Sequence, residues 1–263
     1  MKERITKNML IWYLMSRNAF LSVIGSKLEF GIFFTGKAIR FVMFSVFLVF
    51  LLRGVEKLAG YSLEQTIFIF LTFSLVDVIG QFLYREVYRF KPEIISGNFD
   101  LVLTKPVSAL FRSLMGGADV IDFATLPILI GLTALVGARL EPGIVEAGVY
   151  LLLLVNAIVI TTAFHIMILG LYVRYLGLDY VMNLYRDLLN LGKLPVDVYG
   201  EPVRSALVYL IPVGLMVSVP ARAMMGLVSF GGVVGSLVVG SLLIFLSLRF
   251  WRHSLRFYGS ASS

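Results

Sequence analysis

Long apolar stretches alternate with short polar segments along most of the chain. A helix needs about 20 consecutive apolar residues to cross the hydrocarbon core of a bilayer. Stretches of about this length predict six membrane-spanning helices, at residues 30–52, 62–84, 118–138, 144–172, 203–219 and 226–248. The pattern therefore predicts an all-α integral membrane protein with six transmembrane helices.

The amino-terminal segment, residues 1–29, has a different pattern. Its apolar run is broken at Arg17 and at Lys27, and Trp12 and Tyr13 lie among scattered basic residues. A signal peptide needs an unbroken apolar core. Aromatic and basic residues mixed in this way are typical of an amphipathic helix in the headgroup region, so we predict an interfacial helix.

Basic residues predict the orientation of the spans. If both termini lie in the cytoplasm, only Arg53, Lys57, Arg139 and Arg222 of the 23 Lys and Arg residues fall on the other side. Cytoplasmic loops carry an excess of Lys and Arg. We therefore expect a multi-pass protein of the plasma (cytoplasmic or inner) membrane with both termini cytoplasmic.

Composition supports a single membrane domain over residues 1–263. The chain is 59% hydrophobic with a mean hydropathy of +0.90, against roughly 45–50% apolar residues in soluble domains. The absence of cysteine excludes disulfides and thiol ligands, and neither His165 nor His253 has a metal-ligand neighbour at helical spacing. The net charge of +7 flanks the spans, where lipid headgroups are the natural counter-ions, so no nucleic acid partner is expected.

One stretch matches part of a nucleotide-binding motif, but its other residues do not suit phosphate binding. The stretch "GIFFTGKA", residues 31–38, fits the phosphate-loop pattern at every fixed position except the last, where Ala38 replaces a hydroxyl residue. Such a loop follows a strand and uses small residues to approach the phosphates. Here the interior includes Phe33 and Phe34, and no α/β pattern is present. We expect no cofactor on this chain and no catalysis, with any ATP and magnesium bound by a separate ATPase subunit.

The longest predicted cytoplasmic connection, residues 85–116, has a pattern of short structured pieces. Pro92, Gly97 and Pro106 divide it into a helical piece, a turn at Gly97–Asn98 and a second piece that Asp100 can cap. The predicted surface combines apolar and charged side chains, namely Ile94, Ile95, Leu101, Leu103, Glu93, Asp100 and Lys105. It is either a docking surface or a loop that only returns the chain to the membrane.

Two motifs resemble a known family. The stretch "IISGNFDLVLTKPVSAL" is similar to the "sG-x-[LF]-D-x-x-L-x-[KR]-P-v" signature of ABC-2-type permeases, and "FWRHSLRFYGSASS" resembles the closing "W-x-x-[GS]-L-R-x-Y-s-S-A" of their six-span branch. A weaker third match is "YLIPVGLMVSVPARAMMG". Asn98 and Phe99 stand where Glu and Leu are commoner, and Gly259 interrupts the terminal run of small residues.

The resemblance implies the permease subunit of an ATP-binding cassette exporter that works by alternating access. It implies a coupling helix that seats in a groove of a nucleotide-binding ATPase subunit, present in two copies, and a second permease subunit that is identical or homologous. The residues that match the coupling segment are Glu93, Ile94, Ser96, Gly97, Asp100, Leu101, Lys105 and Pro106. The substrate does not follow from the resemblance.

Charged and polar residues inside the predicted spans form a second group of candidate site residues. They are Arg40, Asp77, Asp119, Asp122 and His165, and we expect them to form a polar cluster at the inner mouth of the translocation path. The acids either pair with Arg40, Arg85 or Arg112 to hold the spans together, or form a vestibule for a cationic solute. Lys37 and Arg40 are expected to extend toward the headgroups.

The last two spans carry packing and bending signals. Gly232, Ser236 and Gly240 lie four residues apart, which permits close helix contact within the subunit or with a second permease. Pro212 and Pro220 interrupt the fifth span. The stretch after Pro220 is predicted to fold back as a re-entrant piece and serve as an outer gate.

Two other functions remain as alternatives at this point. A secondary transporter driven by an ion gradient is expected to carry inverted repeats, and none is found. A membrane-embedded lipid-modifying enzyme needs catalytic groups at a common depth, and only the acids and His165 come near that requirement.

Overall fold

The structure, a computed structural model, describes residues 2–25, 27–53, 57–175 and 177–259. Its α-helices are α1 (Lys2–Gly25), α2 (Lys27–Arg53), α3 (Leu63–Tyr84), α4 (Val87–Ile95), α5 (Asn98–Leu103), α6 (Ala109–Leu114), α7 (Val120–Arg139), α8 (Ile144–Arg174), α9 (Val181–Asn190), α10 (Val203–Ser205), α11 (Val219–Met224) and α12 (Phe230–Ser254). Three short 3₁₀ turns, η1 (Leu191–Lys193), η2 (Val196–Val198) and η5 (Leu255–Phe257), and two π-helical turns, η3 (Ala206–Leu210) and η4 (Gly214–Ser218), complete the described elements.

Five helices among the described residues are long and apolar enough to cross a membrane. The candidate spans are Phe30–Leu51 in α2, Leu63–Ile95 over α3 and α4, Val120–Arg139 in α7, Ile144–Arg174 in α8, and Phe230–Phe257 over α12 and η5. The predicted all-α integral membrane fold is confirmed. The bounds of α3, α7 and α8 agree with the prediction to within two residues, and Ser62 closes a capping box with Gln65 at the start of α3. The last span begins at Phe230 instead of residue 226.

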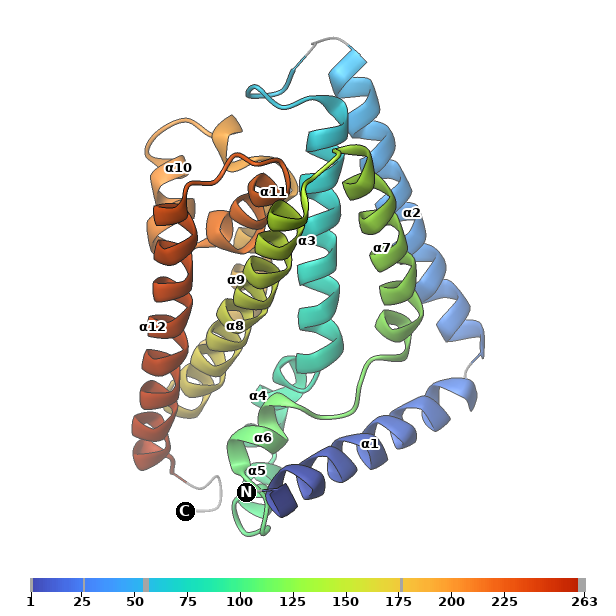
Figure 1. Ribbon diagram of the computed structural model, residues 1–263. Helices are drawn as coiled ribbons and strands as arrows, with labels where there is room; N and C mark the ends of the chain where they lie inside the picture. The colour runs from blue at the N-terminus through green and yellow to red at the C-terminus, as the bar shows by residue number, and fades with distance from the viewer. Residues whose placement is uncertain (1, 26, 54–56, 176, 260–263) are drawn as a thin grey trace.

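The short helices α4, α5 and α6 lie together at one end of the bundle, and the start of α1 and the end of α12 lie at that end too (Figure 1). Helix α1 runs across this end at a steep angle to α2 (Figure 1). Its Ser16 hydroxyl accepts a hydrogen bond from the backbone N–H of Ala118, 3.0 Å away, just before α7. We call this the coupling end of the bundle, and the opposite end the far end.

The fifth crossing was predicted at the wrong place. Helix α9 starts at the coupling end, where the Met182 backbone N–H donates to the Tyr172 hydroxyl near the end of α8. After η2 the chain is at the far end, where the Tyr61 hydroxyl donates to Asp197 over 2.8 Å just before α3. Residues 181–198 therefore cross the bundle. At this buried contact, desolvation and then the Asp197 carboxylate raise the pKa of Tyr61 to about 12.

The segment that was predicted to cross forms a hairpin instead. The arms Val203–Leu210 and Gly214–Met224 are bent by 73° relative to each other at a break that contains Pro212. The first arm begins at the far end, where Arg204 pairs with Asp197 at 2.6 Å. The second arm ends there too, because Met224 lies against Gly137 in the last turn of α7. The hairpin is thus re-entrant, whereas the sequence predicted re-entrance only for the stretch after Pro220.

The hairpin turns earlier than the sequence suggested. It turns at Pro212, whereas the prediction began the fold-back after Pro220. Pro220 lies within the second arm, where α11 directly follows η4, and the break between the arms lies before Gly214.

Helix α12 descends beside α8 along its length (Figure 1). The Asn156 amide of α8 donates to the Ser236 carbonyl and hydroxyl oxygens, at 2.9 and 3.0 Å. A Cβ atom on Gly240 would overlap the Asn156 side-chain oxygen, so a larger residue there requires Asn156 to move. Ser236 and Gly240 therefore pack within the subunit, whereas Gly232 is exposed and does not join this contact.

Candidate functional site: the coupling end and the polar clusters

The connection between α3 and α7 folds into a compact unit. Gly97 separates α4 from α5 and has a φ of 76°, a left-handed conformation that glycine adopts without strain. The turn at Gly97 is where the sequence predicted it. Asp100 lies in the first turn of α5 and does not cap it, because Gly97 occupies the N-cap position. Pro92 lies inside α4 and does not end a helix.

An aromatic cluster joins this unit to the end of α12. Phe99 of α5 contacts Phe90 of α4, with ring centroids 5.0 Å apart, and Trp251 of α12 at 6.4 Å. Tyr258, just after η5, lies edge-on to Phe99 at 5.1 Å. Such aromatic pairs each contribute about 0.5–1.5 kcal/mol beyond their buried area.

A hydrogen bond reinforces the same cluster. The Tyr258 hydroxyl donates to the Asp100 carboxylate over 2.8 Å. Desolvation, followed by this hydrogen bond, raises the pKa of Tyr258 to about 12. The two segments that carry the family resemblance lie far apart in the chain, and here they form one contact surface.

Ion pairs brace the other side of the unit. The Arg112 guanidinium of α6 lies 2.9 Å from Glu86, which precedes α4, and 4.0 Å from Glu93. Lys91 of α4 pairs with Asp179, between α8 and α9. The unit is therefore fixed to α8–α9 as well as to α12.

Part of the predicted docking surface faces solvent. The Leu101 side chain is 59% exposed, Ile95 and Leu103 are also exposed, and Lys105 and Pro106 lie beside them in an exposed turn. Ile94 was predicted to share this surface, but it is only 2% exposed. It is buried because the amphipathic α4 turns that face toward the bundle.

The predicted inner-mouth cluster is divided in two. Asp122 of α7 pairs with Lys37 of α2, and Asp119 pairs with Arg85 at 3.2 Å. Arg85 was one of the predicted partners. Lys37 was expected to extend toward the headgroups, but it turns inward because the Asp122 side chain is fully buried and needs a counter-charge. Arg40 is exposed on α2 and makes no ion pair with a described residue.

Asp77 and His165 line a second, smaller polar site between α3 and α8. The Asp77 carboxylate accepts a hydrogen bond of 2.8 Å from Gln81, and His165 Nδ1 lies 2.8 Å from the Thr161 carbonyl oxygen. The two residues lie in one packed site together with Tyr88 and Tyr185. Within the described residues, His165 Nε2 is buried without a hydrogen-bond partner.

The sequence interpretation missed the basic residues of the true fifth crossing. The Lys193 ammonium lies 5.6 Å from the Phe44 ring centroid and 5.8 Å from that of Phe73, and the Arg186 guanidinium lies 5.8 Å from that of Tyr88. Both cations therefore lie against aromatic rings of the bundle. The amphipathic pattern of residues 181–190 was the available signal, but it indicates a helix on the protein surface as readily as one that crosses the bundle.

A comparison with known protein families identifies the family of this chain. A family model described as "ABC-2 family transporter protein" matches residues 38–262, which include every helix from α3 to α12 and leave out α1. The chain belongs to the ABC-2 family. No curated protein and no solved structure gave a match.

Membership of the ABC-2 family makes this chain an integral membrane component of an ABC transporter. The family typically works with an ATPase subunit and is generally the non-catalytic transport subunit. The exposed apolar surface of α4 and α5 is thus the first place to look for contact with that partner.

Proposed function

We propose that this chain is the permease subunit of an ABC exporter, driven by a separate ATPase through α4 and α5. The observation that carries the proposal is the exposed surface of Ile95, Leu101 and Leu103, held in place by the Phe99–Trp251 contact. An apolar patch on a rigid support is suited to docking in a groove. Movement of α5 is transmitted to α12 because the two share a packed aromatic cluster.

In this proposal two permease subunits, identical or homologous, pair with two ATPase subunits. ATP and magnesium bind to the ATPase subunits, and their closure switches the permeases between inward-open and outward-open states. The coupling end then faces the cytoplasm of the plasma membrane, with both termini on that side. The excess of basic residues at this end supports the orientation. Arg204 is an exception, because it was predicted on the cytoplasmic side and lies at the far end.

The re-entrant hairpin around Pro212 and Pro220 is proposed as the outer gate. It enters from the far end and its tip contacts the fifth crossing, where a Cβ on Gly192 would meet Val213 at 2.8 Å. The Asp119–Arg85 and Asp122–Lys37 pairs are proposed to hold α2, α3 and α7 together, since each acid already has a basic partner.

The experiment uses co-expression with an ABC-type ATPase subunit and measures co-purification and ATP hydrolysis. Leu101→Asp/Leu103→Asp places charge on the docking surface and is expected to lower ATPase recovery at least tenfold. Ile144→Asp is the matched control, because Ile144 is 94% exposed at the far end. Hydrolysis by the purified chain alone, or equal recovery in both variants, contradicts the proposal.

A further inference from the structure

Helix α12 exposes one continuous stripe of side chains from its middle to its end. Val238, Leu242 and Phe245 form the apolar part of the stripe. At spacings of three and four residues, Arg249, Arg252 and Arg256 continue the same face and are also exposed. The opposite face is buried along its length and includes Ser236, Gly240, Ser247, Trp251 and Ser254.

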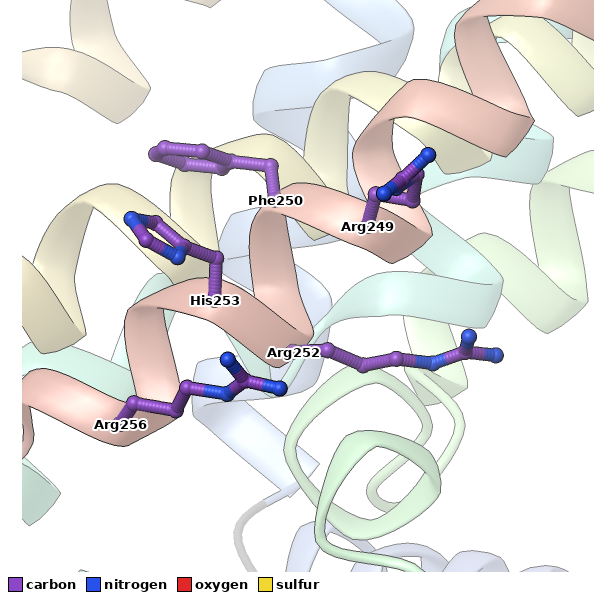
Figure 2. Close-up of a pocket in the computed structure, with 5 residues that line it drawn as sticks. All are labelled: Arg249, Phe250, Arg252, His253 and Arg256. Carbon is purple, nitrogen blue, oxygen red and sulfur yellow. The ribbon is translucent and has the colours of Figure 1, made fainter.

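The basic part of the stripe forms a concave surface. Arg249, Phe250, Arg252, His253 and Arg256 line a depression of about 440 Å³. Figure 2 shows the three arginine side chains leaving one side of the helix, while the Phe250 and His253 rings leave the adjacent side. Among the described residues, no carboxylate lies within ion-pair distance of these arginines.

The apolar part of the stripe identifies what the arginines face. In an integral membrane protein, an exposed face of Val, Leu and Phe contacts acyl chains. The arginines continue that face toward the coupling end, so they lie where the acyl chains of the same leaflet end in headgroups. Arg249 begins this zone, with its guanidinium 5.8 Å from the Phe245 ring centroid.

We propose that Arg249, Arg252 and Arg256 bind the phosphate headgroup of an anionic phospholipid in the leaflet at the coupling end. The guanidinium group pairs with phosphate through two parallel hydrogen bonds, which favours phosphate over a simple counter-ion. The same helical turns carry Trp251 on their other face, against Phe99. A lipid held there therefore rests against the element that supports α5.

The test measures lipid binding to the purified full-length chain by native mass spectrometry, with phosphatidylglycerol and phosphatidylcholine as probes. The variant Arg249→Gln/Arg252→Gln/Arg256→Gln is expected to lose phosphatidylglycerol affinity by about fivefold for each arginine removed. Its phosphatidylcholine binding is expected to be unchanged. Lysine at all three positions keeps the charge but loses the paired guanidinium hydrogen bonds, so it is expected to bind more tightly than the glutamine variant and more weakly than the unchanged chain.

The control Lys57→Gln/Arg89→Gln/Arg139→Gln removes the same charge from exposed positions outside the stripe and is expected to bind phosphatidylglycerol like the unchanged chain. An equal loss in the control, or no loss in the stripe variant, overturns the proposal. Competition by millimolar inorganic phosphate assigns the site to free phosphate and also overturns it. So does a stripe variant that keeps the lipid but loses the ATPase subunit, because the stripe is then a protein contact.

Discussion

At the scale of single residues, the Lys37–Asp122 pair shows how depth decides the role of a charge. The Asp122 side chain is fully buried, whereas that of Lys37 is 30% exposed. The sequence indicated that the acids need partners and offered Arg40, Arg85 or Arg112, of which Arg85 pairs with Asp119. Sequence reasoning missed Lys37, because a lysine near the end of a span can either extend to the headgroups or turn inward to a buried acid, and the sequence does not distinguish the two.

The difference in exposure between Asp122 and Lys37 leads to a testable prediction. Lys37→Met leaves a buried carboxylate unpaired, and breaking a buried pair in this way costs about 3–5 kcal/mol. Asp122→Asn costs less, because Lys37 can still reach water. The double variant Lys37→Met/Asp122→Asn is expected to recover much of the loss. Thermal unfolding of the detergent-purified variants measures this order, and a Lys37→Met variant as stable as the unchanged chain disproves it.

At the scale of elements, the packing of α12 against α8 depends on Gly240. The Asn156 side chain, held by two hydrogen bonds to Ser236, occupies the space beside Gly240. Gly240→Leu is expected to separate the helices and cost about 1–3 kcal/mol, the usual range for overpacking. Gly235→Leu is the matched control, since nothing lies within 4 Å of a Cβ there. Equal melting temperatures for the two variants rule out this packing role.

The fifth crossing is the element that sequence reasoning placed wrongly. Residues 203–219 were more apolar, and 181–190 were too short and too polar to resemble a span. Hydropathy assumes that a crossing helix faces lipid. One face of the crossing at 181–198 packs against the bundle, and there Lys193 and Arg186 lie against aromatic rings. These cations are tolerated at that face because they lie against protein.

Cysteine labelling distinguishes the two topologies, because the chain has no cysteine of its own. Gly177→Cys and Gly200→Cys are both exposed positions. The structure predicts that an impermeant thiol reagent applied from the far side labels position 200 and leaves position 177 unmodified. If both positions react from the same side, residues 181–198 do not cross and the hairpin must span the membrane instead.

At the scale of the whole molecule, sequence reasoning predicted the class of fold, most span bounds and the family. Those features follow from hydropathy and from two local motifs. It did not foresee that the motifs meet at Phe99, Trp251, Asp100 and Tyr258, because contact between distant segments is set by tertiary packing. That contact joins the surface proposed for the ATPase to a membrane-spanning helix, which is what a driven permease requires.

Photo-crosslinking from Leu101 tests this account most directly. A photoreactive amino acid replaces Leu101 in one variant and Ile144 in the other, and adducts formed in intact cells are identified by mass spectrometry. The account predicts a crosslink from position 101 to an ABC-type ATPase subunit and none from position 144. Failure to find an ATPase adduct at position 101, or equal adducts at both positions, contradicts it.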